Sequence, residues 1–301
     1  MKLEARLRAF AAFARKKSFS SAAAELGISQ PAVSKQVAQL EQQLGIKLVE
    51  RSRRDGALTQ AGDFVANHLL RAESLLAQAG LGATQFRQSG PGSVALVASS
   101  LTGTYLLPEI IAEFQYSHPG ARVTMQVGSA EQAIELLRSH RAELGFVAGT
   151  AAAPEIETEP LLEYEVVIVG KSALTSRRPA RDSLEKLTWL SREEGSATRI
   201  SSDQGLARLG IVPRRRLELP SNEALVYALK RGYGIAAISR YVVATELRTG
   251  SLAVIRVRGW NVRNIVSVLR VRDGRLTPSA DRFLTFMRAR LDEMTRQASR
   301  R

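Results

Sequence analysis

The 301-residue sequence contains no cysteine. This absence excludes disulfide bonds, cysteine-ligated zinc, iron–sulfur clusters and thiol nucleophiles, and it is compatible with a reducing cytoplasm. The three histidines, His68, His118 and His140, lie too far apart in the sequence to match any usual metal-ligand spacing. We therefore expect no metal and no other cofactor.

Long apolar runs and familiar catalytic motifs are also missing. No run approaches the roughly 18 apolar residues that a membrane helix needs. The N-terminal stretch interleaves charged and apolar side chains, unlike the apolar core of a signal peptide. The sequence has no GxSxG elbow, no phosphate-binding GxxxxGK[ST] loop and no GxGxxG motif. We expect a cytoplasmic protein that is not an enzyme and has no membrane partner.

Basic residues are abundant instead. The chain has 43 Lys and Arg against 29 Asp and Glu, a net charge of +14. Residues 1–62 hold 11 basic and 5 acidic side chains, whereas residues 93–301 hold 30 and 22. Per residue, the N-terminal segment is therefore more than twice as basic. Such a concentration favours an acidic partner such as nucleic acid, while the dispersed C-terminal excess is typical of a solvated surface.

The N-terminal segment shows the spacing of three short helices. Apolar residues recur every three or four positions in the first of them, at Leu3, Leu7, Phe10 and Ala14. Ser20 is the expected cap of a second helix over residues 21–26, which Gly27 ends. Ser29 is the expected cap of a third helix that runs to Leu44 and ends at Gly45. This order predicts a helix-turn-helix.

The third helix has one apolar and one polar face. Its expected core stripe consists of Val33, Val37, Leu40 and Leu44. The opposite face carries hydrogen-bonding groups and no carboxylate, which suits contacts with base edges in the major groove. The candidate DNA-binding residues of this face are Gln30, Pro31, Ser34, Lys35 and Gln39. The alternative is an ordinary polar helix face.

A small hairpin is expected next. Short apolar runs flank Asp55-Gly56, a dipeptide that favours a tight turn between two strands. Arg51, Arg53 and Arg54 then lie on a protruding wing, where guanidinium groups can bind phosphates or enter a narrow minor groove. The alternative is a solvated basic loop.

These residues resemble the signature of LysR-type transcriptional regulators. The resemblance is carried by Ser18-Phe19-x-x-Ala22-Ala23-x-x-Leu26-x-x-Ser29-Gln30-Pro31-Ala32-Val33-Ser34, Leu40-Glu41, Leu44-Gly45, Glu50-Arg51 and Leu58-Thr59-x-Ala61-Gly62. It implies that residues 1–58 form a winged helix-turn-helix and that a dimer places two recognition helices in successive major grooves of a double-stranded DNA operator. Val49 departs from the family, which usually has phenylalanine there.

A long helix is expected after the wing. Thr59 can cap a helix over residues 60–88, and its apolar stripe needs a partner because no domain surrounds it. The resemblance described above implies that residues 59–89 are a linker and that two copies of its helix join to form a homodimer. Gly80 and Gly82 are expected to bend or fray it. Residues 89–93 read Ser-Gly-Pro-Gly-Ser, a linker composition.

The remaining sequence, residues 93–301, alternates strand-like and helical segments. This alternation predicts an α/β fold whose sheets are largely parallel and covered on both faces, in two lobes that share a cleft. The expected strands contain residues 94–98, 123–127, 144–148, 166–170, 235–239, 252–257 and 265–271. The expected helices contain residues 110–118, 131–140 and 222–231.

Several of the expected strands end in hydroxyl-rich turns before helices. Ligands of open α/β sheets collect at the carboxyl ends of strands, and helix N-termini there favour anions. The candidate effector-binding residues are Ser99, Ser100, Thr102, Thr104, Ser129, Phe146, Ser196, Thr198 and Arg199. The alternative is that each hydroxyl only caps a helix.

Residues 97–129, 191–199 and 221–240 resemble the effector domain of LysR regulators, in particular the branch that includes regulators of carbon fixation and of sulfur or cysteine metabolism. The resemblance implies a fold like that of type II periplasmic binding proteins, with lobe I at residues 93–163 and 267–301 and lobe II at 164–266. It further implies a small, commonly anionic metabolite between the lobes, a homodimer or homotetramer, and RNA polymerase as a further partner to consider. Gly145 departs from the family, which often has aspartate at that position.

Two other interpretations stay open. The C-terminal domain of a DNA-binding regulator can serve oligomerisation alone, without a ligand. A two-lobed domain can also serve as a solute-binding protein or an enzyme, but that interpretation leaves the basic helix-turn-helix unexplained.

Overall fold

The computed structural model describes residues 3–50, 57–87, 92–171, 180–272 and 274–299. The chain forms two compact units. The first comprises residues 1–89 with 138–141, and the second comprises residues 90–137 and 142–301. Within the described ranges, no helix has both the length and the apolar character that a bilayer crossing requires.

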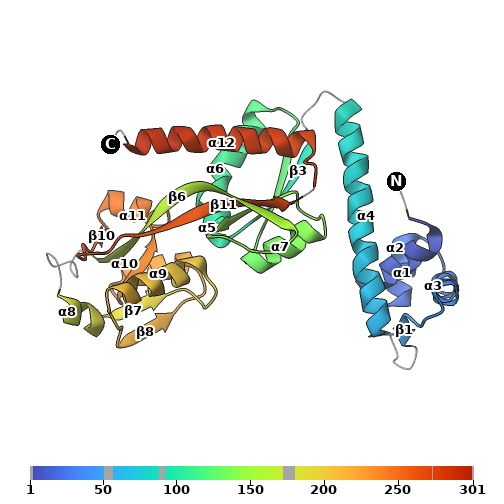
Figure 1. Cartoon of the computed structure of the whole chain (residues 1–301), viewed down its shortest axis with the longest axis horizontal. Coiled ribbons are helices and arrows are strands. Elements are labelled where there is room, and N and C mark those ends of the chain that lie inside the picture. Colours follow the sequence, from blue (N-terminus) through green and yellow to red (C-terminus); the bar gives the residue numbers. More distant parts are fainter. Residues whose placement is uncertain (1–2, 51–56, 88–91, 172–179, 273, 300–301) are drawn as a thin grey trace. The chain divides into compact units, whose positions relative to one another are not determined.

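The N-terminal unit is a three-helix fold with a two-stranded hairpin and a long helix, as predicted (Figure 1). Its elements are α1 (Ala5–Lys16), α2 (Phe19–Leu26), α3 (Gln30–Leu44), β1 (Val49–Glu50), β2 (Ala57–Leu58) and α4 (Gln60–Arg87). Phe10 and Phe13 of α1 are fully buried against Val33 and Val37 of α3. Apolar burial between α1 and α3 therefore holds α3 in place and leaves its opposite face free.

The ends of the short helices follow the predicted signals with one exception. Gly27 and Gly45 adopt left-handed conformations, with φ of 66° and 69°, and end α2 and α3. Ser29 caps α3 by accepting a hydrogen bond from the Ala32 N–H. The prediction of Ser20 as the cap of α2 was wrong: the Ser18 side chain accepts from the Ser21 N–H at 3.3 Å, because the helix already begins at Phe19.

The core stripe of α3 also differs from the prediction at its last position. Leu44 is 44% exposed, because it is the last residue of the helix and extends past the core. Glu41 is buried instead, at 3% exposure. Its carboxylate accepts the backbone N–H groups of Leu48 and Val49, at 2.9 and 3.1 Å. A charged side chain thus ties the end of α3 to the start of the hairpin.

The long helix α4 begins as predicted. Thr59 Oγ1 accepts the Gly62 N–H at 2.9 Å, so this side chain caps the helix. Gly62 has to be glycine, because a Cβ there would lie 2.1 Å from the Leu48 carbonyl oxygen. The helix α4 continues through Gly80 and Gly82 to Arg87, so the expected fraying there was wrong, and a bend at these glycines stays a prediction.

The second unit contains one mixed sheet with helices on both sides (Figure 1). Its strands are β3 (Ser93–Ala98), β4 (Arg122–Val127), β5 (Leu144–Ala148), β6 (Ile156–Lys171), β7 (Thr188–Ser191), β8 (Arg215–Glu218), β9 (Ile235–Ser239), β10 (Leu252–Val254) and β11 (Val262–Val271). Its helices are α5 (Ser100–Tyr105), α6 (Leu107–Ser117), α7 (Ala130–Arg138), α8 (Arg181–Lys186), α9 (Ala197–Arg208), α10 (Asn222–Lys230), α11 (Ala244–Thr249) and α12 (Pro278–Ser299).

The alternation of strands and helices predicted largely parallel sheets. This prediction was wrong, because the sheet is mixed. The strand order is β4-β3-β5-β11-β6-β9-β7-β8, with β10 paired to β6. β3 pairs in parallel with β4 and β5, and β7 pairs in parallel with β8 and β9. The long strands β6 and β11 run antiparallel to each other and to their outer neighbours. They carry the chain from one half of the sheet to the other and back.

Helices cover both faces of the first half of this sheet. Phe114 of α6 packs edge-on against Phe283 of α12, and both are buried in a cluster with residues of β3 and β5. Leu137 of α7 is buried in a separate cluster with Val97 of β3 and Val147 of β5. The parallel strands are thereby fixed between apolar layers, and the turns at their carboxyl ends are held in defined positions.

Candidate functional site

The polar face of α3 lies free of the N-terminal core. Gln30, Pro31, Lys35 and Gln39 are exposed and Ser34 is half-buried, so all five predicted DNA-binding residues of α3 reach the surface. Ser29 caps the helix immediately before them. This is the arrangement in which the first turn of a recognition helix meets base edges in the major groove.

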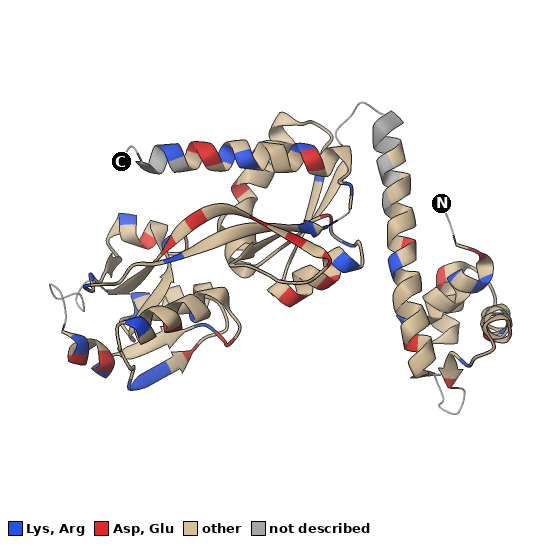
Figure 2. Cartoon of the chain, viewed as in Figure 1, with Lys and Arg blue, Asp and Glu red and all other residues tan. Residues whose placement is uncertain are grey.

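The charge on this face suits a polyanion. Lys35 is the charged residue on the exposed side of α3, and the acidic residue of the helix, Glu41, is buried and lies 3.0 Å from the Lys47 ammonium group. Figure 2 marks the positions of the basic and acidic residues on the ribbon of the chain. No carboxylate on the outer face of α3 therefore opposes the approach of DNA phosphates.

The predicted hairpin is present at its base. β1 and β2 pair antiparallel, with Val49 opposite Leu58 and Glu50 opposite Ala57. Arg51, Arg53 and Arg54, the predicted wing contacts, lie outside the described residues. Because Glu41 binds the start of β1, α3 and the base of the hairpin are connected directly.

A cleft of about 630 Å³ opens in the second unit. It is lined by turns that directly follow the parallel strands β3, β4, β5 and β7, together with the first residues of α9 and α10. Five of the predicted effector-binding residues line it, namely Ser99, Ser100, Ser129, Ser196 and Thr198. The carboxyl ends of four strands meet at this cleft. In open α/β sheets, ligands commonly bind at that edge of the sheet.

Four other predicted residues do not line the cleft. Thr102 is fully buried, and its hydroxyl donates to the carbonyl oxygens of Phe146 and Ser99, at 2.6 and 3.0 Å. Phe146 is itself buried in the apolar core beside α12. Thr104 is exposed elsewhere on α5. The guanidinium of Arg199 pairs with Asp203 at 2.6 Å and donates to the Arg192 carbonyl oxygen at 2.9 Å, so it is used within the chain. Thr102 therefore supports the wall from behind rather than forming it.

Other polar residues of the wall were not predicted. Arg192 directly follows β7, a short strand that the periodicity did not reveal, and Thr150 follows β5 after a glycine. Asn222 is the first residue of α10, and Asn264 lies on β11. For Thr150 and Asn222 the signal was available, since Thr150 follows an expected strand and Asn222 begins an expected helix.

The described wall of the cleft carries more negative than positive charge, with the guanidinium of Arg192 and the carboxylates of Glu131, Glu193 and Glu194. Arg192 is only 7% exposed, and its guanidinium donates to both carboxylate oxygens of Glu193, at 2.7 and 2.6 Å. Burial raises the pKa of Glu193, but the hydrogen bonds from Arg192 outweigh it and the pKa lies below its usual value. The Ser129 hydroxyl likewise lowers the pKa of Glu131. Since Arg192 is already paired, an oxyanion in the cleft depends on neutral N–H and hydroxyl donors.

The N-terminus of α9 opens directly on the cleft. Ser196 precedes the helix without a side-chain hydrogen bond to it, and Ser196, Ala197 and Thr198 all line the wall. The first N–H groups of a helix have no intrahelical acceptor, and they carry the positive end of the helix dipole. This is the cleft's best-formed position for an oxyanion.

Gly145, where the family often has aspartate, lies away from the cleft. A Cβ there would meet Leu137, Leu269 and Val97 side-chain atoms at 3.1 to 3.5 Å. The position belongs to the apolar layer under α7. We therefore assign it no part in ligand contact.

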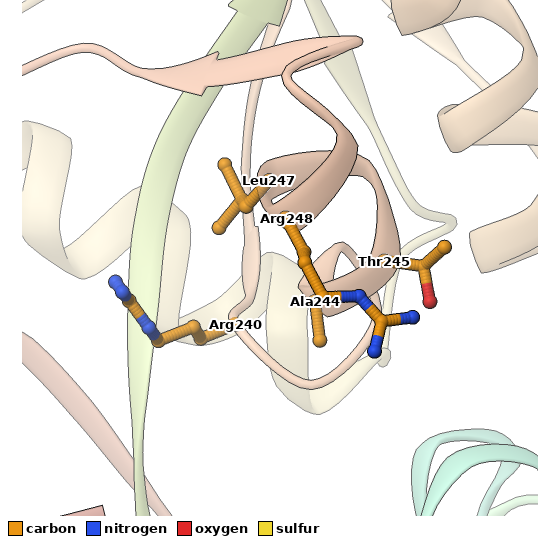
Figure 3. A pocket seen from close by; sticks show the side chains of 5 residues that line it. All are labelled: Arg240, Ala244, Thr245, Leu247 and Arg248. Atoms are coloured by element: carbon orange, nitrogen blue, oxygen red, sulfur yellow. The ribbon is translucent and has the colours of Figure 1, made fainter. Parts of the chain in front are cut away.

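A separate hollow of about 520 Å³ lies beside α11, lined by Arg240, Ala244, Thr245, Leu247 and Arg248 (Figure 3). The side chains of Arg240 and Arg248 point away from each other in this view, and Arg240 forms an ion pair with Glu165 at 3.5 Å. Of the residues that line this hollow, only Arg240 directly follows a strand, β9, whereas four strands end at the cleft. The cleft at the strand ends is therefore the stronger candidate site.

Comparison with known proteins identifies both units. Residues 5–63 match the lysR family of bacterial regulatory helix-turn-helix proteins, and residues 87–292 match the LysR substrate binding domain. The chain is 30% identical to the HTH-type transcriptional regulator CbbR of Rhodospirillum rubrum, over 94% of this chain and 95% of that protein. It is also 30% identical to a RuBisCO operon transcriptional regulator of Allochromatium vinosum, over 93% and 94% of the two chains.

Solved structures share the fold. Full-length CbnR, in a crystal structure with its target DNA, has a TM-score of 0.70 at 21% identity and covers 94% of this chain and 98% of its own. The regulatory domain of Synechocystis PCC6803 CcmR, in complex with 2-PG, has a TM-score of 0.60 at 24% identity and covers 67% of this chain and 98% of its own. These likenesses agree with a helix-turn-helix joined to a two-lobed α/β domain.

Proposed function

The chain belongs to the LysR family of transcriptional regulators, and from this premise we propose that a small metabolite with an oxyanion group controls its DNA binding from the cleft of the second unit. The observation that carries the proposal is the uncapped N-terminus of α9, opening on a cleft that Ser99, Ser100 and Ser129 also line. N–H and hydroxyl donors from separate elements converge there, as an oxyanion requires.

The regulator acts in the cytoplasm as a homodimer joined through α4, or as a tetramer built from such dimers. Phe64 and Leu75 support a partner for α4, because they are 66% and 47% exposed and lie on the same side of the helix, three turns apart. Two copies of α3 then read two half-sites of an operator. The metabolite changes this arrangement only if it binds the two states with different affinity.

The assignment of the polar face of α3 to base recognition is tested by measuring the DNA sequence preference of variants. Gln30→Ala and Ser34→Ala remove hydrogen-bonding groups that face the major groove, so each should relax base preference at one or two operator positions, by about 1–3 kcal/mol. Selection from a randomised DNA pool followed by footprinting measures this. Gln43→Ala, an exposed glutamine near the C-terminal end of α3, is the matched control. Wild-type preference in both Gln30 and Ser34 variants would exclude them as base readers.

The cleft is tested by ligand binding. A thermal-shift screen of small organic acids, sulfate, sulfite and phosphorylated sugars should find compounds that raise the melting temperature, since a ligand stabilises the state that binds it. Ser196→Ala removes a hydroxyl from the wall and should weaken the best compound several-fold. Ser117 lies on α6 and outside the cleft wall, so Ser117→Ala should leave the affinity for that compound unchanged. If no compound shifts the wild-type protein, the ligand-independent regulator becomes the better interpretation.

A turnover assay on the same compounds separates the enzyme alternative. Within the described residues, no group of three or more histidine, aspartate or glutamate side chains is placed to hold a metal ion. We expect every compound to be recovered unchanged after incubation with the protein. Product formation that scales with protein concentration would contradict the proposed function.

A further inference from the structure

Asn222 is the first residue of α10 and lies in the wall of the cleft. It is 1% exposed, and neither its side-chain oxygen Oδ1 nor its nitrogen Nδ2 has a hydrogen-bond partner among the described residues. Ser221 already caps the helix by accepting the Ala224 N–H at 3.1 Å, so Asn222 is not needed as the cap. Buried amides are normally paired, which marks this one as a group that a ligand can complete.

Asn264 provides a direct contrast in the same cleft. Its Nδ2 donates to Ser201 Oγ at 2.8 Å, and its Oδ1 accepts the Ile265 N–H at 2.8 Å. Asn264 therefore has a complete structural role within the chain. Both asparagines line the cleft, but only Asn222 has both amide atoms unpaired among the described residues.

The chemistry of the amide limits what can pair with it. Nδ2 donates two hydrogen bonds and Oδ1 accepts, so a bare oxyanion satisfies Nδ2 and leaves Oδ1 unpaired. A hydroxyl or ammonium group beside the oxyanion donates to Oδ1. One ligand with both groups thus completes the side chain, whereas an analogue without the donor leaves a buried acceptor unsatisfied.

The carboxylates around the cleft favour a ligand that carries a hydrogen-bond donor beside its acid group. The wall contains one basic side chain, Arg192, already bound by Glu193, together with Glu131 and Glu194. A multiply charged anion finds no free cation there. A small acid with a neighbouring hydroxyl or ammonium group places its oxyanion near the N–H groups of α9 and its donor toward the acceptors of the wall.

We propose that the cleft selects small acids that carry a hydrogen-bond donor next to the acid group, a hydroxy acid or an amino acid, and that Asn222 is the residue that selects them. The inference rests on the proposed function, because it names the ligand class of the same cleft. It differs from that function in one respect: an oxyanion alone is not enough for tight binding.

Three compounds of equal size test this selection. Lactate, alanine and propionate share three carbons and a carboxylate, and they differ in bearing a hydroxyl, an ammonium or no donor on the second carbon. With the full-length protein, lactate or alanine should bind about 10-fold or more tightly than propionate by calorimetry. Whichever of the two binds better identifies the class as hydroxy acid or amino acid.

Asn222→Leu keeps the side chain near its size and removes both polar atoms. It should bring the three affinities within about twofold of one another, and it should leave the ligand-free melting temperature unchanged or higher, because two unpaired buried groups are gone. Ser239→Ala is the control, because Ser239 is a buried polar residue outside the cleft wall and its hydroxyl accepts the Tyr241 N–H. It should lower the ligand-free melting temperature and keep the preference ratio.

The outcomes separate this inference from the proposed function. If sulfate or another simple anion shifts the melting temperature while lactate and alanine bind no better than propionate, the selection by Asn222 is overturned and the cleft remains a ligand site. A wild-type preference that persists in Asn222→Leu also overturns it, as does a lower ligand-free melting temperature in that variant. If neither these acids nor the wider set of anions binds, the proposed function itself fails.

Discussion

Lys35→Glu should lower operator affinity by more than 100-fold while leaving the fold of the N-terminal unit intact. Lys35 is exposed in the second turn of α3, next to Ser34 and away from the buried stripe of that helix. A lysine at this position contributes about 1–3 kcal/mol through a guanine or phosphate contact. A glutamate removes that contact and adds repulsion from the phosphates. Because a dimer presents two copies of α3, the loss is incurred twice.

Binding to the operator should be measured by fluorescence anisotropy at several salt concentrations. Fewer phosphate contacts predict a lower dependence of affinity on salt. Lys186→Glu is the control, since it makes the same charge change at an exposed lysine in the second unit. If both variants bind equally well, the net charge of the chain and not the position of Lys35 determines DNA binding.

The short-range signals of the sequence predicted most of the N-terminal unit. Ser29 caps α3, Thr59 caps α4, and Gly27 and Gly45 end their helices, because each signal involves residues within one turn of each other. The hydroxyl-rich turns of the cleft were found for the same reason. A turn between a strand and a helix is local, and in a parallel sheet the carboxyl ends of the strands lie on one edge.

The errors came from the partners that polar side chains find in the folded chain. Arg199 was expected in the cleft because it follows Ser196 and Thr198, but a partner one turn along α9, Asp203, holds its guanidinium elsewhere. Thr102 was expected there for its hydroxyl, which instead donates to the Phe146 carbonyl oxygen on a neighbouring strand. Periodicity gives the exposed side of an element, and it does not give the partner that a polar side chain will find.

Local sequence patterns also did not predict the lengths and directions of several strands. The first part of β6 alternates glutamates with other residues over Ile156–Glu165, and its pairing with β11 stabilises it as a strand. β7 and β8 have four residues each, too few for a clear period. The antiparallel direction of β6 and β11 follows from a chain that crosses between the two halves twice, which no window of sequence reveals.

Glu41→Ala should destabilise the N-terminal unit by about 3–5 kcal/mol, a large effect for one side chain. Glu41 is 3% exposed, and its carboxylate accepts the N–H groups of Leu48 and Val49. Alanine leaves these two buried donors without a partner and opens space at the junction of α3 and β1. Lys47, whose side chain is 74% exposed, adds little to the effect because water screens an ion pair at the surface.

Glu41→Gln separates the charge from the hydrogen bonds. Its amide oxygen can still accept from the hairpin, so the loss should be smaller, about 1–2 kcal/mol. Burial raises the pKa of Glu41, but the hydrogen bonds from Leu48, Lys47 and Val49 outweigh it and the pKa lies below its ordinary value of 4.5. The ionised carboxylate therefore stabilises the folded state above that value, and this contribution is lost as the pH falls through the folded-state pKa. The Gln variant should lack this part of the acid sensitivity.

Hydrogen exchange gives the sharpest measurement, because it follows the two amides directly. Exchange at Leu48 and Val49 should accelerate by about 100-fold or more in Glu41→Ala, and operator affinity should fall with it, since the base of the wing loses its attachment to α3. Glu50→Ala, an exposed glutamate on β1, is the matched control and should cost less than about 0.5 kcal/mol. If the amides of Leu48 and Val49 stay protected in Glu41→Ala, the hairpin is held by its apolar contacts, and the buried carboxylate of α3 does not determine the position of the wing.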